Sequence, residues 1–285
     1  SVEKFLGENR YDYIFVIGDV DSSLGCAVGA KNSSHKVVHI EAGLRSHDMD
    51  MPEERNRIEI DRISDIKFVS EPDGIVNLKS ENLYSDEDTF LVGNVMIDTF
   101  VSNISNIEGV ELKDEVNLER GSYCIVTVHR PSNVDFKNRL KALLSYLDSL
   151  SNDIKVLFPV HPRTLIAIEK WGLSKLLKNI IVTEPLGYFE FLNRMKNSRY
   201  IITDSGGAQE ESMYLRIPCI TIRSCTERPI TLRYGTSFLA GEDMNLLRYY
   251  SKLACEGRLE CDRRGGYELW DGQVSGRIYS ALESL

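Results

Sequence analysis

Long hydrophobic runs are missing from this sequence, and so are cysteine pairs and any excess of positive charge. No apolar stretch approaches the ~20 residues that a membrane-spanning helix needs. The six cysteines are scattered without a CxxC pair, which favours reduced thiols and predicts no metal site. Acidic residues outnumber basic ones, 43 to 34, and the formal net charge is −9. This balance argues against nucleic acid and anionic membranes as partners.

The N-terminal stretch SVEKFLGENRYDY lacks the cationic start and apolar core of a signal peptide. With 42% hydrophobic and 27% charged residues, the composition is that of an ordinary globular protein. We therefore expect a cytoplasmic protein, and the length of 285 residues favours two domains.

Short apolar runs alternate with helical stretches along the chain. The run 13–17, YIFVI, lacks polar alternation, which is typical of a strand that is buried on both faces of a parallel sheet. The expected strands are 13–17, 36–40, 66–69, 90–94, 123–128, 156–160, 180–182, 200–202 and 218–222. The expected helices are 24–31, 72–83, 137–150, 164–178, 188–197 and 208–215, with one more starting at Pro52.

This order of elements predicts an α/β fold of two Rossmann-like, doubly wound domains. The first domain is expected over 1–100 and the second over 121–271. The polar segment 102–120 is expected to cross between them, and 272–285 to return to the first domain.

Residues 199–211, RYIITDSGGAQEE, combine a strand, a glycine turn and the first turn of a helix. Such a turn leaves backbone N–H groups free to bind a phosphate, and glycine lets the phosphate approach the main chain. Glu211, about one turn into the helix, is expected to accept hydroxyl groups of a bound ribose. Taken alone, the glycine pair is better explained as an ordinary strand-to-helix turn. Whether it binds phosphate has to be judged together with the other strand ends.

Polar residues follow the predicted strands in both halves. Because ligands of open parallel sheets bind at the carboxyl ends of the strands, these six ends predict a cleft between two domains. Two simpler alternatives stay open: Asp19 caps a helix, and Glu53 forms a surface ion pair with Arg57, four residues further along. The strand ends carry Asp19, Glu41, His129 with Arg130, His161 with Arg163, Ser205 with Gly206 and Gly207, and Glu227 with Arg228.

Nine motifs occur in a fixed order over nearly the whole chain. They are GDVDSS (18–23), HIEAGLRS (39–46), MPEERNR (51–57), GN (93–94), HRPSNVD (129–135), PVHPRT (159–164), EPLGYFEFL (184–192), TDSGGAQEE (203–211) and TERP (226–229). Together they resemble the non-hydrolysing UDP-N-acetylglucosamine 2-epimerases, which have the GT-B architecture of two Rossmann-like domains around a cleft.

The resemblance implies a reaction without metal or redox cofactor. A base removes the proton at C2 of the sugar while the C1–O bond to UDP breaks, and UDP adds back after reprotonation on the other face. By motif match, Asp19 and Glu41 are expected to act as acid and base, with Glu53 as a third carboxylate. His129, Arg130 and the backbone amides of Ser205, Gly206 and Gly207 are expected to receive the diphosphate.

The other binding residues follow from the same motifs. Glu211 is expected to hold the ribose and Phe191 to pack on the uracil. Arg57 is expected to steady Glu53 or to touch phosphate, and His161, Arg163 and Arg228 to contact the substrate. The expected partners are a UDP-sugar and a second copy of the chain in a homodimer.

Members of this family normally begin with a strand that carries a Gly-Thr-Arg-Pro phosphate motif, and the present sequence starts after it. Three explanations stay open: a fragment, strands supplied by another chain, or lost activity. Three alternative functions also stay open: epimerisation of a diacetamido-uronate UDP-sugar, hydrolysis to free N-acetylmannosamine and UDP, or UDP-sugar binding without catalysis.

Overall fold

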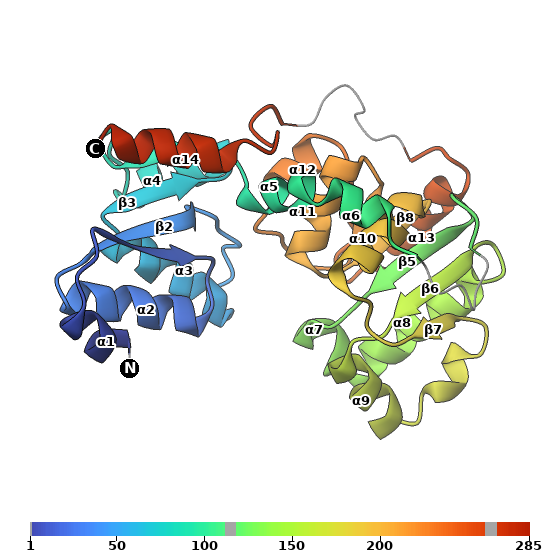
Figure 1. Cartoon of the computed structure of the whole chain (residues 1–285). Helices are drawn as coiled ribbons and strands as arrows, with labels where there is room; N and C mark the ends of the chain where they lie inside the picture. Colours follow the sequence, from blue (N-terminus) through green and yellow to red (C-terminus); the bar gives the residue numbers. More distant parts are fainter. Residues whose placement is uncertain (1, 112–117, 260–266) are drawn as a thin grey trace. The chain divides into compact units, whose positions relative to one another are not determined.

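The structure is a computed structural model that describes residues 2–111, 118–259 and 267–285. The chain forms two compact units (Figure 1). Unit 1 consists of Ser1–Thr99, Cys225–Ile230 and Tyr267–Leu285, and unit 2 of Phe100–Ser224 and Thr231–Gly266. The sequence boundaries placed 225–230 and 267–271 with the second domain, whereas here both segments group with unit 1.

Unit 1 is built on a parallel sheet of four strands in the order β1-β2-β3-β4. The strands are β1 (Tyr13–Ile17), β2 (Lys36–Ala42), β3 (Ile66–Val69) and β4 (Thr89–Leu91). The helices are α1 (Val2–Glu8), α2 (Asp21–Asn32), α3 (Pro52–Ile63), α4 (Pro72–Ser80), the start of α5 (Val95–Ser102) and the C-terminal α14 (Val274–Glu283). Prolines in the first turns of α3 and α4 need no backbone N–H there, which explains where both helices begin.

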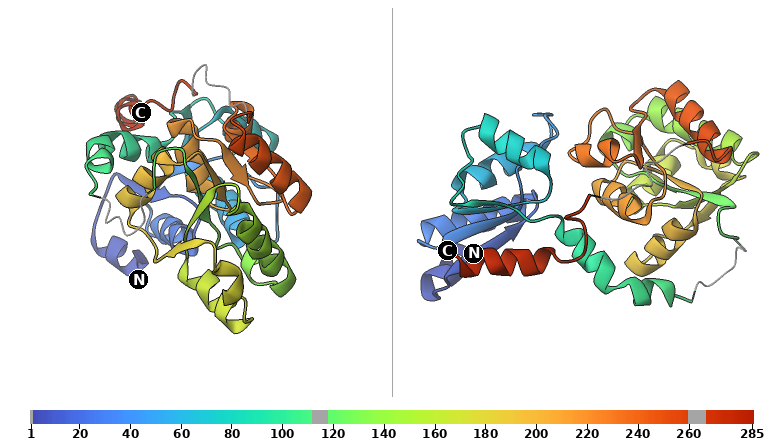
Figure 2. Two further views of the ribbon diagram at one scale, coloured as in Figure 1. Left: turned by 90° about the vertical axis from the view of Figure 1, so that its right-hand side faces the viewer. Right: turned by 90° about the horizontal axis from the view of Figure 1, so that it is seen from above.

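The C-terminal helix belongs to the core of unit 1. Val274 and Ile278 of α14 are buried with Val38 of β2 and Phe68 of β3. Figures 1 and 2 show this helix, in red, beside the blue strands of unit 1. Trp270 just before it donates its indole N–H to the carbonyl of Ser70 at 3.1 Å. The predicted return of the chain end is therefore a packing contact that unit 1 depends on.

The predicted burial of β1 on both faces is wrong. Phe15 and Ile17 are 44% and 56% exposed, whereas Val16 between them is 3% exposed. Among the described strands, β1 pairs only with β2, so it is an edge strand with one face covered. The remaining strands of this sheet are more enclosed, and β3 is buried at every position.

Unit 2 contains a parallel sheet of six strands in the order β10-β9-β8-β5-β6-β7. Here β5 (Tyr123–Thr127) and β8 (Tyr200–Thr203) are neighbours, although β6 (Lys155–Pro159) and β7 (Ile181–Thr183) come between them in sequence. The strand order therefore reverses at the β5–β8 pair, which is the topological switch point where such sheets bind ligands. The other strands are β9 (Cys219–Thr221) and β10 (Ser237–Leu239).

The helices of unit 2 differ from the predicted ones in several places. A helix over 164–178 was expected, but α9 (Pro162–Lys170) ends before Gly172, whose φ is +66°, and a 3₁₀ turn follows at Ser174–Leu177. The predicted crossing 102–120 contains α6 (Ile104–Glu108), whose Ile107 is buried in a core of unit 2, while 112–117 lies outside the described residues. The other helices are α7 (Pro131–Val134), α8 (Lys137–Leu150), α10 (Tyr188–Asn197), α11 (Gly206–Leu215), α12 (Pro229–Arg233) and α13 (Met244–Cys255).

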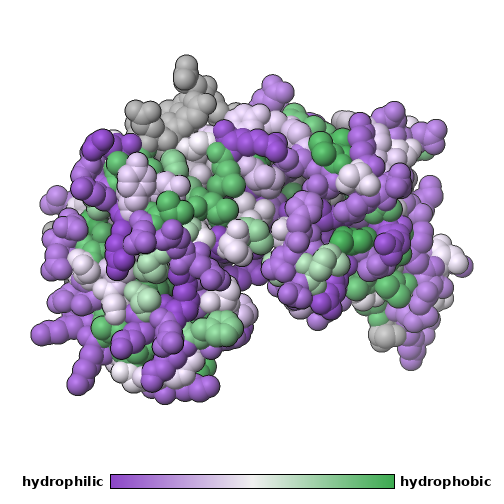
Figure 3. Space-filling model, turned by 180° about the vertical axis from the view of Figure 1, so that it is seen from behind, coloured by the Kyte–Doolittle hydropathy of each residue, from purple (hydrophilic) through white to green (hydrophobic). Residues whose placement is uncertain are grey.

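The α/β class with two parallel sheets is confirmed. Hydrophilic side chains cover most of the face seen in Figure 3, and hydrophobic ones form small separate groups there. Within the described ranges no helix is both long and apolar enough to cross a bilayer. The five described cysteines are free thiols, and Cys261 lies outside the described residues.

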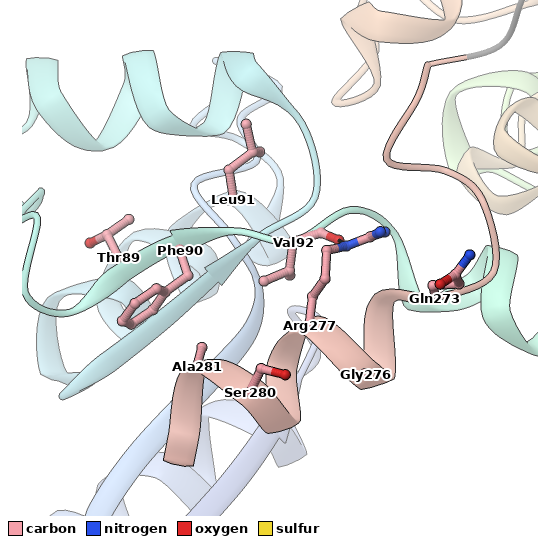
Figure 4. Close-up of a pocket in the computed structure, with 9 residues that line it drawn as sticks. All are labelled: Thr89, Phe90, Leu91, Val92, Gln273, Gly276, Arg277, Ser280 and Ala281. Carbon is pink, nitrogen blue, oxygen red and sulfur yellow. Dashed lines mark hydrogen bonds between the residues drawn. The ribbon is translucent and has the colours of Figure 1, made fainter. Parts of the chain in front are cut away.

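A groove of about 770 Å³ lies in unit 1 between β4 and α14 (Figure 4). Arg277 reaches across it and donates to the carbonyl oxygens of Val92 at 2.6 Å and Leu269 at 2.7 Å. The same guanidinium pairs with Asp271, at 2.8 Å. The groove runs along β4, which is an edge strand, and not across the carboxyl ends of the strands. Arg277, the cation among its lining residues, already joins α14 to the end of β4.

Gly93 offers a direct test of how tightly this corner of unit 1 is packed. Its φ is +98°, and a Cβ atom there would lie 2.1 Å from the carbonyl oxygen of Leu269. Gly121 in unit 2 has a φ of +73° with nothing within 4 Å of such a Cβ, so it is a matched control. We expect Gly121→Ala to lower the free energy of unfolding by about 1 kcal/mol. Gly93→Ala should lower it by about 2–4 kcal/mol, because overpacking is added. Equal effects in urea titrations of the two variants would contradict the close packing.

Candidate functional site

In unit 1, two acidic residues stand at the carboxyl ends of neighbouring parallel strands. Asp19 follows β1, and Glu41 lies at the end of β2. Arg57 from α3 places its Nη2 atom 2.5 Å from Asp19 Oδ2. Asn56, the preceding residue, donates to the backbone carbonyl of Asp19 at 2.9 Å. A buried guanidinium and an amide therefore fix both the side chain and the backbone of Asp19.

Glu41 has an unusual backbone. Its φ is +72°, in the left-handed region that non-glycine residues rarely adopt, and the register of β2 against β3 shifts between Ile40 and Ala42. Arg228, from the Cys225–Ile230 segment of unit 1, lies 3.6 Å from Glu41 through its Nη2 and the carboxylate Oε2. The Glu41 side chain is 13% exposed. Strain of this kind persists where the surrounding structure enforces it, often at functional sites.

The third predicted carboxylate, Glu53, is half-buried in the first turn of α3. Arg57 pairs with Asp19, with Glu54, whose Oε2 lies 2.7 Å from Arg57 Nη1, and more distantly with Glu227, at 3.9 Å. Glu54 also accepts from the backbone N–H groups of Ser46 and His47. Burial raises the pKa of Glu54, but these hydrogen bonds and Arg57 outweigh it and hold the pKa below the usual range. Glu54 was not among the predicted residues, although its i, i+3 spacing to Arg57 is a usable signal.

In unit 2, the buried carboxylate of Asp204 joins two strand ends at the switch point. Asp204 follows β8 and accepts the backbone N–H groups of His129 and Arg130, which follow β5, at 3.1 and 2.9 Å. Asn133 donates to the same carboxylate at 3.0 Å. The side chain of Asp204 is 0% exposed. It thereby holds the predicted His-Arg pair beside the glycine turn.

His129 is half-buried among other basic groups. Its Nδ1 lies 3.3 Å from Asp204 Oδ1, and its ring centroid lies 5.4 Å from that of His161. Burial lowers the pKa of His129 and, although Asp204 opposes this, the charges of Arg130, His161 and Arg163 lower it further. The neutral imidazole form of His129 is therefore favoured unless a negatively charged group binds beside it.

The remaining basic residues of this edge differ in their exposure. Arg130 is half-buried, whereas His161 and Arg163 are exposed. Arg163 pairs with Asp135, with 2.6 Å between Nη2 and Oδ2. His161 precedes α9, and its ring Nδ1 accepts the backbone N–H of Arg163 at 3.2 Å.

The glycine turn after β8 is the first turn of α11 itself, two residues earlier than predicted. Ser205 caps the helix and accepts from the backbone N–H of Ala208 at 3.5 Å. Gly206 and Gly207 begin the helix, and a Cβ at Gly207 would meet nothing within 4 Å. The N-terminus of α11 thus presents backbone N–H groups and open space, the arrangement that suits an anion.

Glu211 lies one turn into α11 and is 5% exposed. Burial raises its pKa to about 7, although a hydrogen bond from Tyr188 opposes the shift. Tyr188 begins α10, the helix that also carries Phe191. Phe191 is half-buried and packs against the core cluster that contains Leu192 and Ile201. Tyr188 was not among the predicted residues, because a tyrosine at a helix start carries no distinctive signal.

The backbone strain at Glu41 can be measured with two substitutions that both remove the carboxylate. Glycine adopts a φ of +72° without penalty, whereas alanine does not. We expect Glu41→Gly to be more stable than Glu41→Ala by about 1 kcal/mol in urea unfolding, the opposite of their usual order. An alanine variant as stable as the glycine variant would show that the left-handed conformation costs nothing.

Comparisons with known proteins agree with the geometry. The family model of UDP-N-acetylglucosamine 2-epimerase matches residues 1–283. A UDP-N-acetylglucosamine 2-epimerase of Methanococcus maripaludis is 37% identical over 98% of this chain and 76% of its own length. A UDP-2,3-diacetamido-2,3-dideoxy-D-glucuronate 2-epimerase of Pseudomonas aeruginosa is 32% identical over 100% of this chain and 78% of its own.

The crystal structure of Methanocaldococcus jannaschii UDP-GlcNAc 2-epimerase in complex with UDP-GlcNAc and UDP superposes with a TM-score of 0.88 and 35% sequence identity. The match covers 100% of this chain and 79% of that structure. Each relative is therefore longer than the present chain, and the GT-B fold expected from the motifs is confirmed. The chain belongs to the UDP-N-acetylglucosamine 2-epimerase family.

Proposed function

We propose that this protein interconverts UDP-N-acetylglucosamine and UDP-N-acetylmannosamine by elimination and re-addition of UDP. The observation that carries the proposal is the carboxylate pair of unit 1, Asp19 and Glu41, each held next to an arginine at the end of neighbouring strands. The solved relative that contains UDP-GlcNAc and UDP supports this choice of substrate.

The elimination requires a group that takes the C2 proton as the C1–O bond breaks, and re-addition requires a proton delivered to the opposite face. Two carboxylates can divide this work, and we infer that Asp19 and Glu41 are the pair, with Glu53 as a third carboxylate. Their side chains are mostly withdrawn from water, 23% and 13% exposed, so each can be held in one position relative to the sugar, as proton transfer requires. Arg57 and Arg228 hold the two side chains in place.

The departing diphosphate needs positive charge and N–H donors where negative charge develops. We infer that the N-terminus of α11, at Ser205, Gly206 and Gly207, supplies donors and that His129 and Arg130 supply charge. A diphosphate beside His129 would favour its imidazolium form, which burial and the neighbouring cations otherwise disfavour by lowering the pKa. His161 and Arg163 extend this basic edge, Glu211 is proposed to bind the ribose, and Phe191 to pack on the uracil.

The relative that acts on a diacetamido-uronate sugar also matches the whole chain, so this substrate is the second candidate. Proton NMR in D₂O separates the possibilities. Deuterium at C2 with the UDP-sugar retained indicates an epimerase of the sugar tested. Free N-acetylmannosamine indicates hydrolysis, and saturable binding without exchange indicates a binding protein. We further infer a homodimer in the cytoplasm, and sedimentation equilibrium tests the dimer.

The carboxylate assignment predicts a large loss of rate with little loss of stability. Asp19→Asn and Glu41→Gln keep size and hydrogen bonding but remove the titratable proton, so each should lower the epimerisation rate by about 10²–10⁴. Glu59→Gln, which alters an exposed i, i+3 pair with Arg62, is the control and should leave the rate unchanged. If both carboxylate variants epimerise at the parent rate, with normal deuterium uptake at C2, the acid and base must be other residues.

The raised pKa of Glu211 predicts that nucleoside binding depends on pH. Ribose hydroxyl groups prefer an ionised acceptor, so binding must release the proton that Glu211 carries below a pH of about 7. The affinity should therefore rise as the pH increases from 5 to 7 and then level off. Uridine is the probe, because it carries no phosphate that titrates in this range.

Calorimetry in two buffers of different ionisation enthalpy measures the released proton. Glu211→Gln should abolish the pH dependence and weaken uridine binding by about 1–3 kcal/mol, whereas Glu184→Gln, at an exposed position, should change neither. A parent protein whose uridine affinity is flat from pH 5 to 7 would contradict the ribose role of Glu211.

A further inference from the structure

A buried carboxylate lies behind the turn that carries Glu41. Asp61, on α3, is 0% exposed and receives three donors. His39 Nδ1 lies 2.6 Å from its Oδ1, while Arg45 Nη1 at 2.8 Å and the backbone N–H of Gly43 at 3.0 Å share its Oδ2. These three partners come from the stretch 39–45, with Glu41 in the middle.

We propose that Asp61 is the positioning residue of Glu41: by binding the stretch on both sides, it holds the Glu41 backbone in the left-handed conformation that directs the carboxylate toward Arg228. The proposal rests on the proposed function only where it concerns the reaction. The geometry of the turn is independent of it.

The conformation of this turn needs an external anchor. Glu41 and Gly43 both have positive φ, +72° and +78°. An L-residue in this region is disfavoured by about 1–2 kcal/mol, so an unanchored chain would relax toward an extended strand. Relaxation at Glu41 would turn its side chain to a different direction, because the side-chain direction follows the backbone dihedrals.

The far side of the turn is closed by tight packing. A Cβ on Gly43 would lie 2.4 Å from the carbonyl oxygen of Gly74 in α4. Asn77 of the same helix donates to the carbonyl of Gly43 at 2.8 Å. Asp61 therefore binds the N–H of Gly43 and Asn77 binds its C=O, so both backbone groups of one residue are fixed from two helices.

The partners of Asp61 are themselves held by further contacts. Arg45 is held by Glu81 through two hydrogen bonds of 2.8 and 2.6 Å. Burial alone would raise the pKa of Asp61, but His39 and Arg45 outweigh it and keep the pKa below its ordinary value. The remaining ring nitrogen of His39 lies 3.3 Å from the carbonyl of Gly18, next to Asp19. Burying an ion pair adds little net stability, because both charged groups lose their hydration. Fixing the geometry of the turn is a more specific reason for Asp61 to be buried here.

The test compares Asp61→Asn with Asp65→Asn. Asp65 is a more exposed control, with its side chain 35% exposed: it too accepts one backbone N–H, from Val37 of β2 at 2.7 Å, and pairs with one basic side chain, Lys31 at 2.7 Å. Its contact lies at the amino end of β2, away from Glu41. We expect Asp61→Asn to lower kcat about 10–100-fold with KM within about twofold of the parent, and Asp65→Asn to leave both unchanged.

Two further measurements separate positioning from general damage. In a Glu41→Gln background, Asp61→Asn should reduce kcat by no more than about threefold, because its effect passes through a carboxylate that is already absent. The amide of Gly43 should exchange with deuterium faster in Asp61→Asn than in the parent or in Asp65→Asn. If Asp61→Asn does not fold, Asn77→Ser loosens the same turn from the other helix and should show the same pattern more weakly.

Loss of kcat in Asp65→Asn equal to that in Asp61→Asn would overturn the proposal, and so would an unchanged Gly43 exchange rate in a folded Asp61→Asn protein. Failure of the proposed function is a separate result. If Glu41→Gln keeps full activity, the acid/base assignment falls, while the exchange measurement still decides whether Asp61 anchors the turn.

Discussion

A buried carboxylate that accepts backbone N–H groups of the turn after a strand is the interaction on which both candidate sites depend. Asp61 does this for Gly43 in unit 1, and Asp204 does it for His129 and Arg130 in unit 2. A parallel strand ends with backbone groups that no neighbouring strand satisfies, and burying them unpaired is expensive. An acceptor from another element solves this problem and also fixes where the side chains of the turn point.

The two sites use the interaction differently. Asp204 comes from a neighbouring strand end, so it fixes the spacing of two strand ends across the switch point. Asp61 comes from a helix that packs behind β2, and it fixes the direction of a single residue by contacting the His39 side chain before it and the Gly43 backbone after it. In both cases the carboxylate that holds the turn accepts several donors, and the side chains of the turn keep contacts of their own, such as that of Glu41 with Arg228.

The sequence predicted nine of the ten described strands, because apolar runs such as 180–182 and 200–202 lack polar alternation and are bounded by turn residues, but β10 (Ser237–Leu239) was not predicted. It failed where the outcome depends on distant partners. Phe15 and Ile17 carry the same local signal as a central strand, and only their edge position leaves them exposed. Asp61 appears in sequence as an ordinary charged helix residue, because His39 and Arg45, which make its burial possible, are 22 and 16 positions away. Arg228 follows a strand of unit 2 along the chain, yet its carboxylate partner is Glu41 of unit 1.

The C-terminal helix has a consequence for how the protein is made. Val38 and Phe68 are synthesised long before Val274 and Ile278, with which they share a core. The core residues of unit 2 lie between them in the chain, from Phe100 to Leu259. On the ribosome, unit 2 therefore has all of its core available before unit 1 does, although unit 1 begins to emerge first. Unit 1 therefore lacks part of its core until α14 has left the exit tunnel, whereas an N-terminal domain usually folds first during translation.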